Sequence, residues 1–522
     1  MRMTNKIMRN NSLYNLNQNK LLEDKLTNQM TNQSKIARPS DDPVVAIRAL
    51  RLRSNVAHVT QYYEKNAKDA QQWLDVTSDA LKTIGDILED LYKQATSAAN
   101  KDLTADDLDI LLTQMKSLTK EFYASGNVDY AGRYIFSGYR TDTAITFSAE
   151  DIAEMKSHPV SYKIKEKLGF SDIDSFNFTD YSALSDTIAG DGVDTDGTSY
   201  EQKITNTKLY RLRLSYDSLD GVVKDINNKV ILPSFTAEGG VPLKDAAGND
   251  MVITEYADAE AAYRAIANGT EKGIAYIPST GELVFSQDFY QNFQEGEGYE
   301  VTYEKSNWIE GDINPVHYFE CTETKDIGEG KTKTTIYNTI ATTLPQDIYY
   351  DVGFNQKIQV NTLTSEVFTH NVQRDMDDFQ RCLAQLRGIE TQISDITKKR
   401  DEFPEDSVEY KNWNKKLEAA EKAASYIRDN IHTQFENQIT KYQDYINDTN
   451  VANTSNATRG SRLELISSRL MNQQATFKDL QTDNESIDVT QVAVELSSSE
   501  LIYQAALMAT GKIMQTNLMN YI

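Results

Sequence analysis

A long run of regularly spaced apolar residues begins about fifty residues into the chain. From Leu52 to Leu91, twelve positions follow one another at alternating steps of four and three residues, and two of them, Asn66 and Thr77, are polar. A stripe with this period lies along one face of an α-helix and has to be covered by a partner helix. The run therefore predicts a long helix of the coiled-coil type.

Similar helical stripes occur on both sides of the middle of the chain. Thr104 and Asp107 resemble a capping box at the start of a second helix. After about residue 365 the helical pattern returns, and an Asn- and Thr-rich stretch at residues 448–460 interrupts it. We expect separate helices before and after that stretch.

The middle of the chain has a different composition. Between residues 140 and 370 lie 17 of the 24 glycines and six of the nine prolines, among short runs rich in Tyr, Val and Ile. Such punctuation predicts strands and turns. The expected fold class is mainly α with a β-rich insertion. The N- and C-terminal helices pair into an elongated coiled-coil or bundle core, and the central mixed α/β insertion projects outwards.

These boundaries divide the chain into three expected parts. Residues 1–42 and 484–522 are the terminal helical assembly segments. Residues 43–140 and 365–483 form a helical bundle core with a small hairpin, and residues 141–364 form a variable, β-rich outer insertion of one or two subdomains.

Both ends of the chain carry apolar residues suited to packing against other helices. The first 55 residues have ten Lys or Arg and four Asp or Glu, whereas residues 461–522 have four and seven, so the ends can pair by charge. The C-terminal segment is apolar on more than one face, which indicates that other subunits surround it. The residues expected to mediate assembly are Ile7, Tyr14, Leu21, Leu26, Val492, Leu496, Tyr503, Ala506, Leu507, Ile513, Met514, Leu518 and Tyr521.

The stretch ARPSDDPVVAIRA separates the first two helical patterns. Pro39 disfavours helix at Arg38, so the first helix is expected to end there. Asp42 suits the N-cap and Pro43 the first position of the next helix. Asp41 adds negative charge at the positive end of that helix.

Composition excludes several classes of function. A formal net charge of −24 argues against nucleic acid as a partner, because phosphate binding requires a basic surface. The sequence has no apolar run of 18 residues, so we expect no membrane insertion. Cys321 and Cys382 provide neither a disulfide framework nor the spacing of metal ligands.

The search for catalytic and metal-binding motifs gives no candidate. The sequence contains no phosphate-binding GxxxxGK[ST], HExxH or CxxC motif. The segment DGVDTDGTSYE is the nearest to a calcium loop, but Gly192 and Lys203 stand where that loop requires ligands. We therefore expect no catalytic residue, cofactor or metal site.

Four segments, in order along the chain, carry a family resemblance. They are MRMTNKIMRNNSLYNL, RPSDDPVVAIRA, GRYIFSGYRT and ESIDVTQVAVELSSSELIYQAALMATGKIMQTNLMNYI. Together they resemble the flagellin superfamily over residues 1–140 and 460–522, and more loosely over 365–460. The helix-junction motif Arg38, Pro39, Ser40, Asp41, Asp42 and Pro43 is similar to that of the hook–filament junction branch, and so is the hairpin motif with Gly132, Phe136, Ser137 and Gly138.

This resemblance implies a structural subunit of the bacterial flagellum, with no enzymatic activity. Members of the family pair their terminal segments as coiled coil to build the inner tube of the axial structure, and the junction branch couples hook to filament. The implied partners are further copies of the chain, the other hook-associated junction protein, flagellin, and an export chaperone on the C-terminal segment. The implied location is the extracellular flagellum, reached without a cleaved signal peptide.

Two alternatives stay open at this stage. The chain could be a filament flagellin, which is also structural but is present along the whole filament. It could also be a surface adhesin or binding module, in which residues 141–364 do the binding and the helices form a stalk.

Overall fold

The structure is a computed structural model. It describes residues 5–100, 103–185, 199–226, 230–237, 239–243, 251–291, 293, 298–328, 330–338 and 346–515. The chain divides into two compact units. Unit 1 comprises residues 1–72, 350–358 and 460–522, and unit 2 comprises residues 73–349 and 359–459. These two units have other boundaries than the three parts expected from the sequence, and they do not test that division. The three parts stay a prediction.

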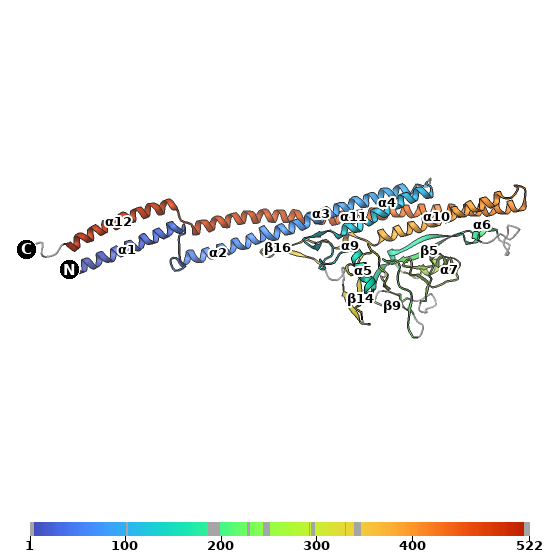
Figure 1. Cartoon of the computed structure of the whole chain (residues 1–522), viewed down its shortest axis with the longest axis horizontal. Helices are drawn as coiled ribbons and strands as arrows, with labels where there is room; N and C mark the ends of the chain where they lie inside the picture. The colour runs from blue at the N-terminus through green and yellow to red at the C-terminus, as the bar shows by residue number, and fades with distance from the viewer. Residues whose placement is uncertain are drawn as a thin grey trace, which may run out of the picture. The chain divides into compact units, whose positions relative to one another are not determined.

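The chain is mostly helical, with its strands in the middle of the sequence, so the predicted fold class is confirmed (Figure 1). The long helices are α1 (Asn5–Asn32), α2 (Pro43–Thr60), α3 (Lys68–Ala98), α4 (Ala105–Ala124), α10 (Asn371–Asp401), α11 (Val408–Glu485) and α12 (Val489–Gln515). Shorter helices are α5 (Ala149–Ser157), α6 (Tyr200–Lys203), α7 (Ala259–Ala267), α8 (Gln287–Tyr290) and α9 (Thr364–Val367).

The stripe that begins at Leu52 lies on helix throughout, as predicted. Between α2 and α3 the chain takes a π-helical segment, η1 (Gln61–Ala67), in place of a regular α-helix. The second predicted helix is α4, and its capping box is present: Thr104 Oγ1 accepts from the backbone N–H of Asp107, and the Asp107 carboxylate accepts from the backbone N–H of Thr104.

Helix α11 is continuous through residues 448–460, so the predicted break is wrong. Asn456 is buried, and its Nδ2 donates to the backbone oxygen of Leu74 at 2.8 Å. The Thr449 hydroxyl donates to the carbonyl of Tyr445, one turn earlier in the same helix. Because these polar side chains find partners while the backbone stays helical, poor intrinsic propensity does not end the helix.

The strands form two larger sheets in unit 2. One sheet has the order β10-β11-β12-β5-β4 and the other β15-β14-β3-β13-β8-β9. Their strands are β3 (Val160–Gly169), β4 (Ile173–Asp180), β5 (Thr205–Arg213), β8 (Ser234–Ala237), β9 (Val241–Pro242), β10 (Ile253–Glu255), β11 (Ile274–Ile277), β12 (Glu282–Phe285), β13 (Gly298–Lys305), β14 (Glu320–Asp326) and β15 (Thr332–Asn338). Three two-stranded ribbons add β1 (Asp129–Tyr130) with β2 (Arg133–Tyr134), β6 (Val223–Lys224) with β7 (Val230–Leu232), and β16 (Tyr349–Gly353) with β17 (Gln356–Gln359).

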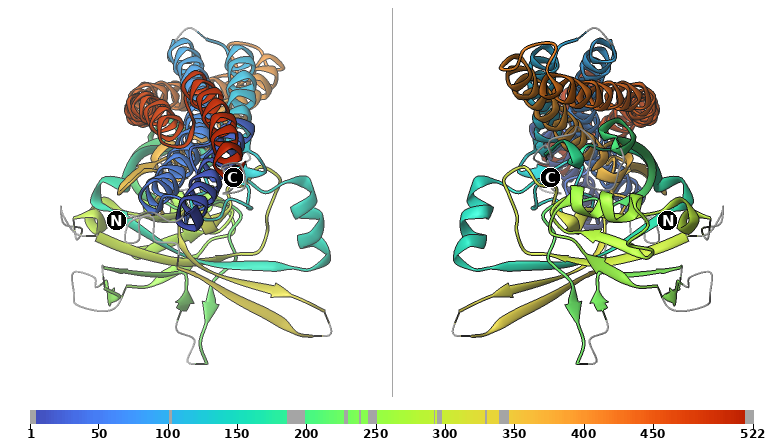
Figure 2. Two further views of the ribbon diagram at one scale, coloured as in Figure 1. Left: turned by 90° about the vertical axis from the view of Figure 1, so that its left-hand side faces the viewer. Right: turned by 90° about the vertical axis from the view of Figure 1, so that its right-hand side faces the viewer.

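Within unit 2 the sheets lie on one side of the long helices, as both side views show (Figure 2). An aromatic core joins the two sheets, and it includes the buried side chains of Tyr276, Tyr303 and Trp308. A second cluster, around Tyr263, packs α7 against β11 and β12. The insertion therefore has a core of its own and also a face toward the helices.

Candidate functional site

The terminal helix pair of unit 1 contains most of the residues expected to mediate assembly. Helices α1 and α12 pack side by side (Figure 1). On α12, Val492 is buried, and Leu496, Tyr503 and Ala506 are half-buried. On α1, Leu26 is buried. One of the two predicted faces of α12 is therefore largely covered within the chain.

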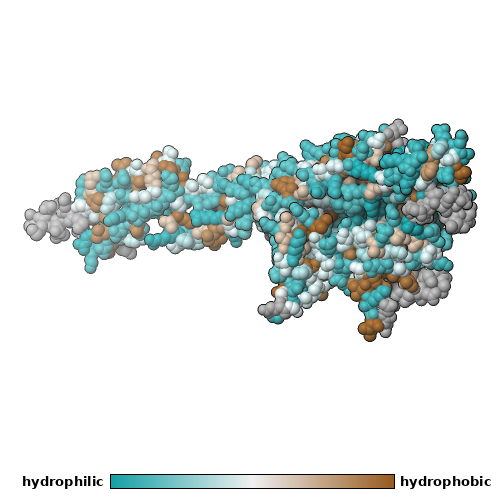
Figure 3. Space-filling model, turned by 45° about the vertical axis from the view of Figure 1, so that its right-hand side comes forward, coloured by the Kyte–Doolittle hydropathy of each residue, from teal (hydrophilic) through white to brown (hydrophobic). Residues whose placement is uncertain are grey.

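Other assembly residues lie on surfaces that no part of the described chain covers. Tyr14 is 64% exposed and Leu21 is 63% exposed, and Ile7 and Leu507 are also exposed. Further apolar residues of the same helices are exposed although they were not among the predicted assembly residues: Met8, Leu13, Leu22, Val494, Leu501, Ile502 and Met508. The helical spacing of these residues can be read from the sequence. The sequence does not indicate which of the two apolar faces the partner helix covers. Figure 3 shows brown apolar patches interrupting the polar surface along these helices.

Four of the predicted assembly residues cannot be placed as side chains. Leu518 and Tyr521 lie outside the described residues. Ile513 and Met514 belong to α12 by its bounds, but their side chains are outside the description.

The helix junction begins earlier than the prolines predicted. Helix α1 ends at Asn32, and Gln33 has a φ of +51°, in the left-handed region that stops a right-handed helix. The expectation that Pro39 ends this helix at Arg38 is therefore wrong. Pro39 and Ser40 lie in the exposed connection that follows.

The junction of α1 with α2 pairs with the junction of α11 with α12. Ser34 and Ser486 form an antiparallel bridge, and the backbone N–H of Lys35 donates to the carbonyl of Glu485 at 2.8 Å. The backbone N–H of Ile487 donates to the carbonyl of Gln33 at 3.4 Å. Backbone N–H and C=O groups that lose their helical partners at one junction thus form hydrogen bonds with those of the other junction. A single junction would leave these groups without protein partners.

Asp42 and Pro43 take the predicted positions. Asp42 has an extended backbone, and its Oδ1 accepts from the N–H groups of Val44 at 2.9 Å and Val45 at 3.1 Å. Pro43 is the first residue of α2. The effect of the Asp41 charge on the start of α2 stays a prediction. Its Oδ2 accepts from the backbone N–H of Ala37 and of Arg38, so it also orders the connection itself.

Two side-chain contacts tie α2 to the end of α11. Arg53 donates from Nε to Glu485 Oε1 at 2.8 Å, and Asn484 donates to the carbonyl of Val45 at 3.2 Å. The hydrogen bond from Arg53, with burial opposing it, lowers the pKa of Glu485 from its ordinary value. Asp488 then accepts from the first N–H groups of α12, at Thr490 and Gln491.

The hairpin motif lies in unit 2, and a two-residue turn joins its short strands β1 and β2. Gly132, with a φ of +75°, is in that turn. Phe136 and Ser137 lie beyond the strands and are buried. Gly138 has a φ of +65°, and a Cβ there would come within 2.2 Å of Gln346 Oε1. The motif therefore marks a tight, packed connection at the base of the insertion.

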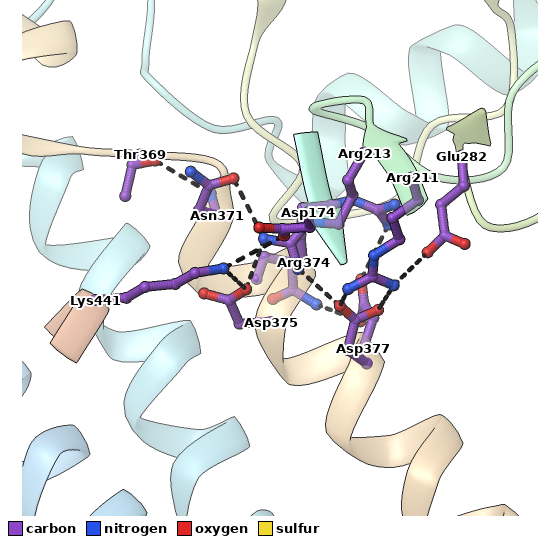
Figure 4. Close-up of polar contacts among 12 residues, drawn as sticks. Asp174, Arg211, Arg213, Glu282, Thr369, Asn371, Arg374, Asp375, Asp377 and Lys441 are labelled. Carbon is purple, nitrogen blue, oxygen red and sulfur yellow. Dashed lines mark hydrogen bonds and ion pairs between the residues drawn. The ribbon is translucent and has the colours of Figure 1, made fainter. Parts of the chain in front are cut away.

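A buried cluster of charges joins the insertion to α10, and the sequence analysis missed it. Arg211 and Arg213 of β5 point toward carboxylates of α10 (Figure 4). Arg213 pairs with Asp375 at 2.6 Å and with Asp378 at 2.8 Å. Arg211 pairs with Asp378 and, at 3.0 Å, with Glu282 of β12. Lys441 of α11 lies 3.6 Å from Asp375.

The charges in this cluster hold one another ionised. Burial would raise the pKa of Asp378, but Arg211, Arg381 and Arg213 hold it well below its usual value. Glu282 is fully buried, yet Arg381 and Arg211 lower its pKa too. Tyr263 donates to Glu282 at 2.6 Å. The arrangement is a buried network of ion pairs that links β5 and β12 to α10, in which Arg211 Nε and Asp375 Oδ2 make no hydrogen bond.

The described residues give no support to metal chemistry. Among them, no three His, Cys, Asp or Glu side chains are grouped so that they could hold a metal ion. The segment compared with a calcium loop falls mostly in residues 186–198, outside the description. Among the described residues, no helix is both long and apolar enough to cross a membrane.

A family model and two curated proteins match part of this chain. Residues 3–141 match the family model described as the bacterial flagellin N-terminal helical region. Flagellar hook-associated protein 3 of Escherichia coli (strain K12) is 32% identical over 123 residues, which are 23% of this chain and 38% of that protein. The protein of the same name from Salmonella typhimurium (strain LT2) is 30% identical over 121 residues, again 23% of this chain and 38% of that protein. The chain thus matches 38% of the length of these curated relatives, and the resemblance inferred from the sequence is confirmed for this segment.

Solved structures give weaker matches over more of the chain. Xanthomonas campestris FlgL has 11% identity and a TM-score of 0.27, and the match covers 82% of this chain and 98% of that one. A structure of a flagellar hook-associated protein from Vibrio parahaemolyticus has 10% identity and a TM-score of 0.26, with coverage of 83% and 100%. Scores this low do not establish a shared fold.

Proposed function

We propose, from the premise that residues 3–141 carry a flagellin N-terminal helical region, that this chain is a structural subunit of the bacterial flagellum. Its two partial relatives are both called flagellar hook-associated protein 3, so we place it at the junction that couples hook to filament. Its role is assembly and not catalysis. Its location is the extracellular flagellum.

One observation carries this proposal: the terminal helix pair leaves apolar faces uncovered. Helices α1 and α12 cover Leu26 and Val492 between them, while Tyr14, Leu21 and Leu501 are exposed. Removing a large apolar side chain from water contributes about 1.5–3 kcal/mol, so several such residues per subunit supply a strong drive to associate. Further copies of the chain are the simplest cover, because every copy carries the same surfaces.

Other partners follow from the proposed place in the flagellum. They are the other hook-associated junction protein on the hook side, flagellin on the filament side, and an export chaperone that holds the C-terminal segment before assembly. The exposed apolar residues of α12 give a chaperone something to bind. We assign binding of all these partners to the terminal helices α1 and α12, without dividing their residues among the partners.

The first test removes residues 484–522. We expect a soluble protein with unit 2 folded that no longer joins filaments to hooks, measured by counting attached filaments in electron micrographs. Normal attachment by the truncated chain would overturn the assembly mechanism.

A gentler variant separates assembly from folding. Leu501→Gln, Ile502→Gln and Met508→Gln together change exposed residues of α12, so the helix should stay folded while attachment falls. The matched control makes Val252→Gln and Ile336→Gln, which are exposed residues of unit 2. Loss of attachment in the control alone would place assembly in the insertion instead.

The same cells distinguish the alternatives. Gold-labelled antibody should mark one point between hook and filament, whereas labelling along the whole filament would identify a filament flagellin. Binding of cells to a surface that is lost in the unit 2 variant, with filaments still attached, would support an adhesive role for the insertion.

A further inference from the structure

A lysine side chain is buried at the end of strand β13 in unit 2. The side chain of Lys305 is 1% exposed, and its Nζ lies 5.9 Å from the ring centroid of Tyr216 and 5.1 Å from that of Trp308. Both aromatic side chains are themselves buried. A site lined in this way excludes the water that would compete with a reaction of the amine.

Two carboxyl groups face the nitrogen of this lysine. Asp217 Oδ1 and Asp312 Oδ2 each lie 3.5 Å from Lys305 Nζ. Nζ also donates to the backbone oxygen of Asp217 at 2.7 Å, which holds the nitrogen between the two side chains. The fold has therefore already brought an amine and two carboxyl groups together, which supplies the entropic part of a reaction between them.

Asp312 is the better electrophile of the two. Its side chain is 15% exposed, whereas that of Asp217 is 38% exposed. Burial raises the pKa of Asp312 above its ordinary value, although Lys305 and a hydrogen bond from Ile309 oppose the rise. An amine attacks a neutral carboxylic acid more readily than a carboxylate. The backbone N–H of Ile309 donates to Asp312 Oδ2 at 3.2 Å, where it can stabilise negative charge that develops on this oxygen.

Two other lysine–carboxylate pairs of unit 2 are closer but lie in contact with solvent. Lys165 is 3.0 Å from Glu300, and Lys325 is 2.6 Å from Glu154. Both lysine side chains are accessible to water, which keeps such pairs ionised. Proximity alone is therefore not enough. Lys305 differs from these two lysines because its contact with a carboxyl group is almost completely buried.

We propose that Lys305 and Asp312 join in an isopeptide bond once unit 2 has folded. The Lys305 ammonium first passes a proton to the Asp312 carboxylate, and the resulting amine attacks Cγ. As the N–C bond forms, the carbonyl electron pair moves to the oxygen that accepts from Ile309. Asp217 takes a proton from the nitrogen and returns it to the hydroxyl group, which leaves as water while the C=O bond re-forms. One ammonium and one carboxylate thus give one amide and one water, with no oxidant or other reactant.

The bond would secure the end of β13 to the first segment of the insertion. The backbone carbonyl of Asp312 accepts from the N–H of Phe147 at 2.9 Å, and the next residue, Ile313, forms an isolated bridge with Thr146. The loop after β13 is therefore already fastened to that segment by hydrogen bonds. This inference concerns unit 2 alone and does not depend on the proposed assembly function.

Mass spectrometry of the purified full chain tests the bond. The intact protein should weigh less than its sequence by one water molecule. Trypsin should fail to cleave after Lys305, so that fragment 273–325 appears, also lacking one water. An intact mass equal to that of the sequence, in protein whose tryptophan fluorescence shows a folded unit 2, would prove the proposal wrong. A link from Lys305 to fragment 214–224, which contains Asp217, would prove the assignment of Asp312 wrong.

Variants distinguish this bond from other losses of water. Lys305→Arg keeps a positive charge but lacks the amine, so it should have its full mass, as should Asp312→Ala. Asp217→Ala keeps both partners and should lower the rate of bond formation at least about tenfold, measured as the linked fraction at equal times after synthesis. Lys165→Arg, the matched control in the same sheet, should still lack one water. A loss of water that persists in Lys305→Arg would overturn the proposal, and an unchanged rate in Asp217→Ala would contradict the proton transfer.

Discussion

In unit 2 the charged side chains of Arg213, Asp375 and Asp378 are buried, whereas in unit 1 the apolar side chains of Tyr14, Leu21 and Leu501 are exposed. Charged residues are usually exposed and large apolar residues usually buried, so both units depart from the usual distribution, unit 2 in its interior and unit 1 on its surface. The buried charges of unit 2 find their partners within the chain. The exposed apolar faces of unit 1 find none in the part of the chain that is described. Unit 2 also exposes apolar residues, such as Val252 and Ile336, but its charged cluster is internal. The paired terminal helices of unit 1 have apolar surfaces that association would cover.

The largest expected effect comes from breaking the buried network of ion pairs in unit 2. Asp378→Asn leaves three arginines without a full set of partners, and removing one member of a buried ion pair costs about 3–5 kcal/mol. Trp73, Trp308 and Trp413, the three tryptophans of the chain, all belong to unit 2, so denaturant unfolding followed by tryptophan fluorescence reports this unit.

The control for this experiment is Asp395→Asn, on the exposed side of the same helix. Its ion pair with Lys398 is solvent-exposed, so its loss should change stability by less than about 1 kcal/mol. Equal effects of the two variants would mean that the buried cluster does not fasten the insertion to α10.

Two buried histidines should each make unit 2 less stable as the pH falls. Burial lowers the pKa of His317 to about 4 and, together with the charge of Arg374, that of His370 to about 3, from an ordinary value of 6.5. Between pH 6.5 and 4 the unfolded chain binds protons that the folded chain does not, so stability falls as the pH falls. At pH 5 each histidine contributes about 2 kcal/mol of this loss.

The measurement is the free energy of unfolding by tryptophan fluorescence at pH 7 and pH 5. The buried Asp377, whose pKa is raised to about 6, contributes in the opposite sense and offsets part of the loss. His370→Gln should therefore make stability at pH 5 relative to pH 7 higher by about 2 kcal/mol, although it lowers the stability at pH 7. His58→Gln, on an exposed site of α2, should leave the difference unchanged. If His370→Gln leaves the difference between the two pH values unchanged, the interpretation of His370 as buried and neutral is wrong.

A smaller effect concerns the start of α2 in unit 1. Asp42→Ala removes the acceptor for the N–H groups of Val44 and Val45 and should cost about 1 kcal/mol. Hydrogen exchange of those two amides should accelerate, with the amides of unit 2 unaffected. Asp42→Asn keeps a capping oxygen and should restore most of the protection; failure to do so would show that the cap is not the cause.

The smallest effect is expected at the ion pair between α2 and α11. The Arg53 side chain is 62% exposed, so solvent screens its pair with Glu485, and such pairs contribute about 0.2–1 kcal/mol. A double-mutant cycle with Arg53→Ala and Glu485→Ala, followed by thermal melting, should give a coupling in this range. The coupling should shrink at high salt, and a larger, salt-independent value would mean that the pair is shielded from solvent.

Local signals in the sequence predicted local structure well. The cap at Asp42, the capping box at Thr104 and the helical stripe from Leu52 each depend on residues within a few turns of one another. The break expected at 448–460 was wrong because the partner that satisfies Asn456 lies on α3, far away in the sequence. The end of α1 was misplaced because Gln33 gives no strong signal for a left-handed backbone.

Long-range features could not be predicted for the same reason. Arg211 and Asp378 are 167 residues apart, and no pattern in either segment indicates the other. In the terminal helices the apolar residues of both faces were visible, but the sequence does not say which face the partner helix takes. The sequence showed that Asn66 is a polar residue in an apolar stripe. It did not show that the Asn66 side chain donates to the backbone oxygen of Asp351, which is 285 residues away.

The meeting of the two helix junctions in unit 1 also sets an order of folding. Lys35 and the carbonyl of Asp483 that it contacts are 448 residues apart, whereas unit 2 draws on residues 73–349 and 359–459. Unit 2 also needs distant contacts, such as that of Asn456 with Leu74, but its last segment ends at residue 459, whereas α12, the partner of α1, is synthesised after it. During synthesis, unit 2 can therefore fold while α1 waits for its partner helix. Unit 1, with its exposed apolar faces, is completed last, when synthesis of the chain is nearly finished.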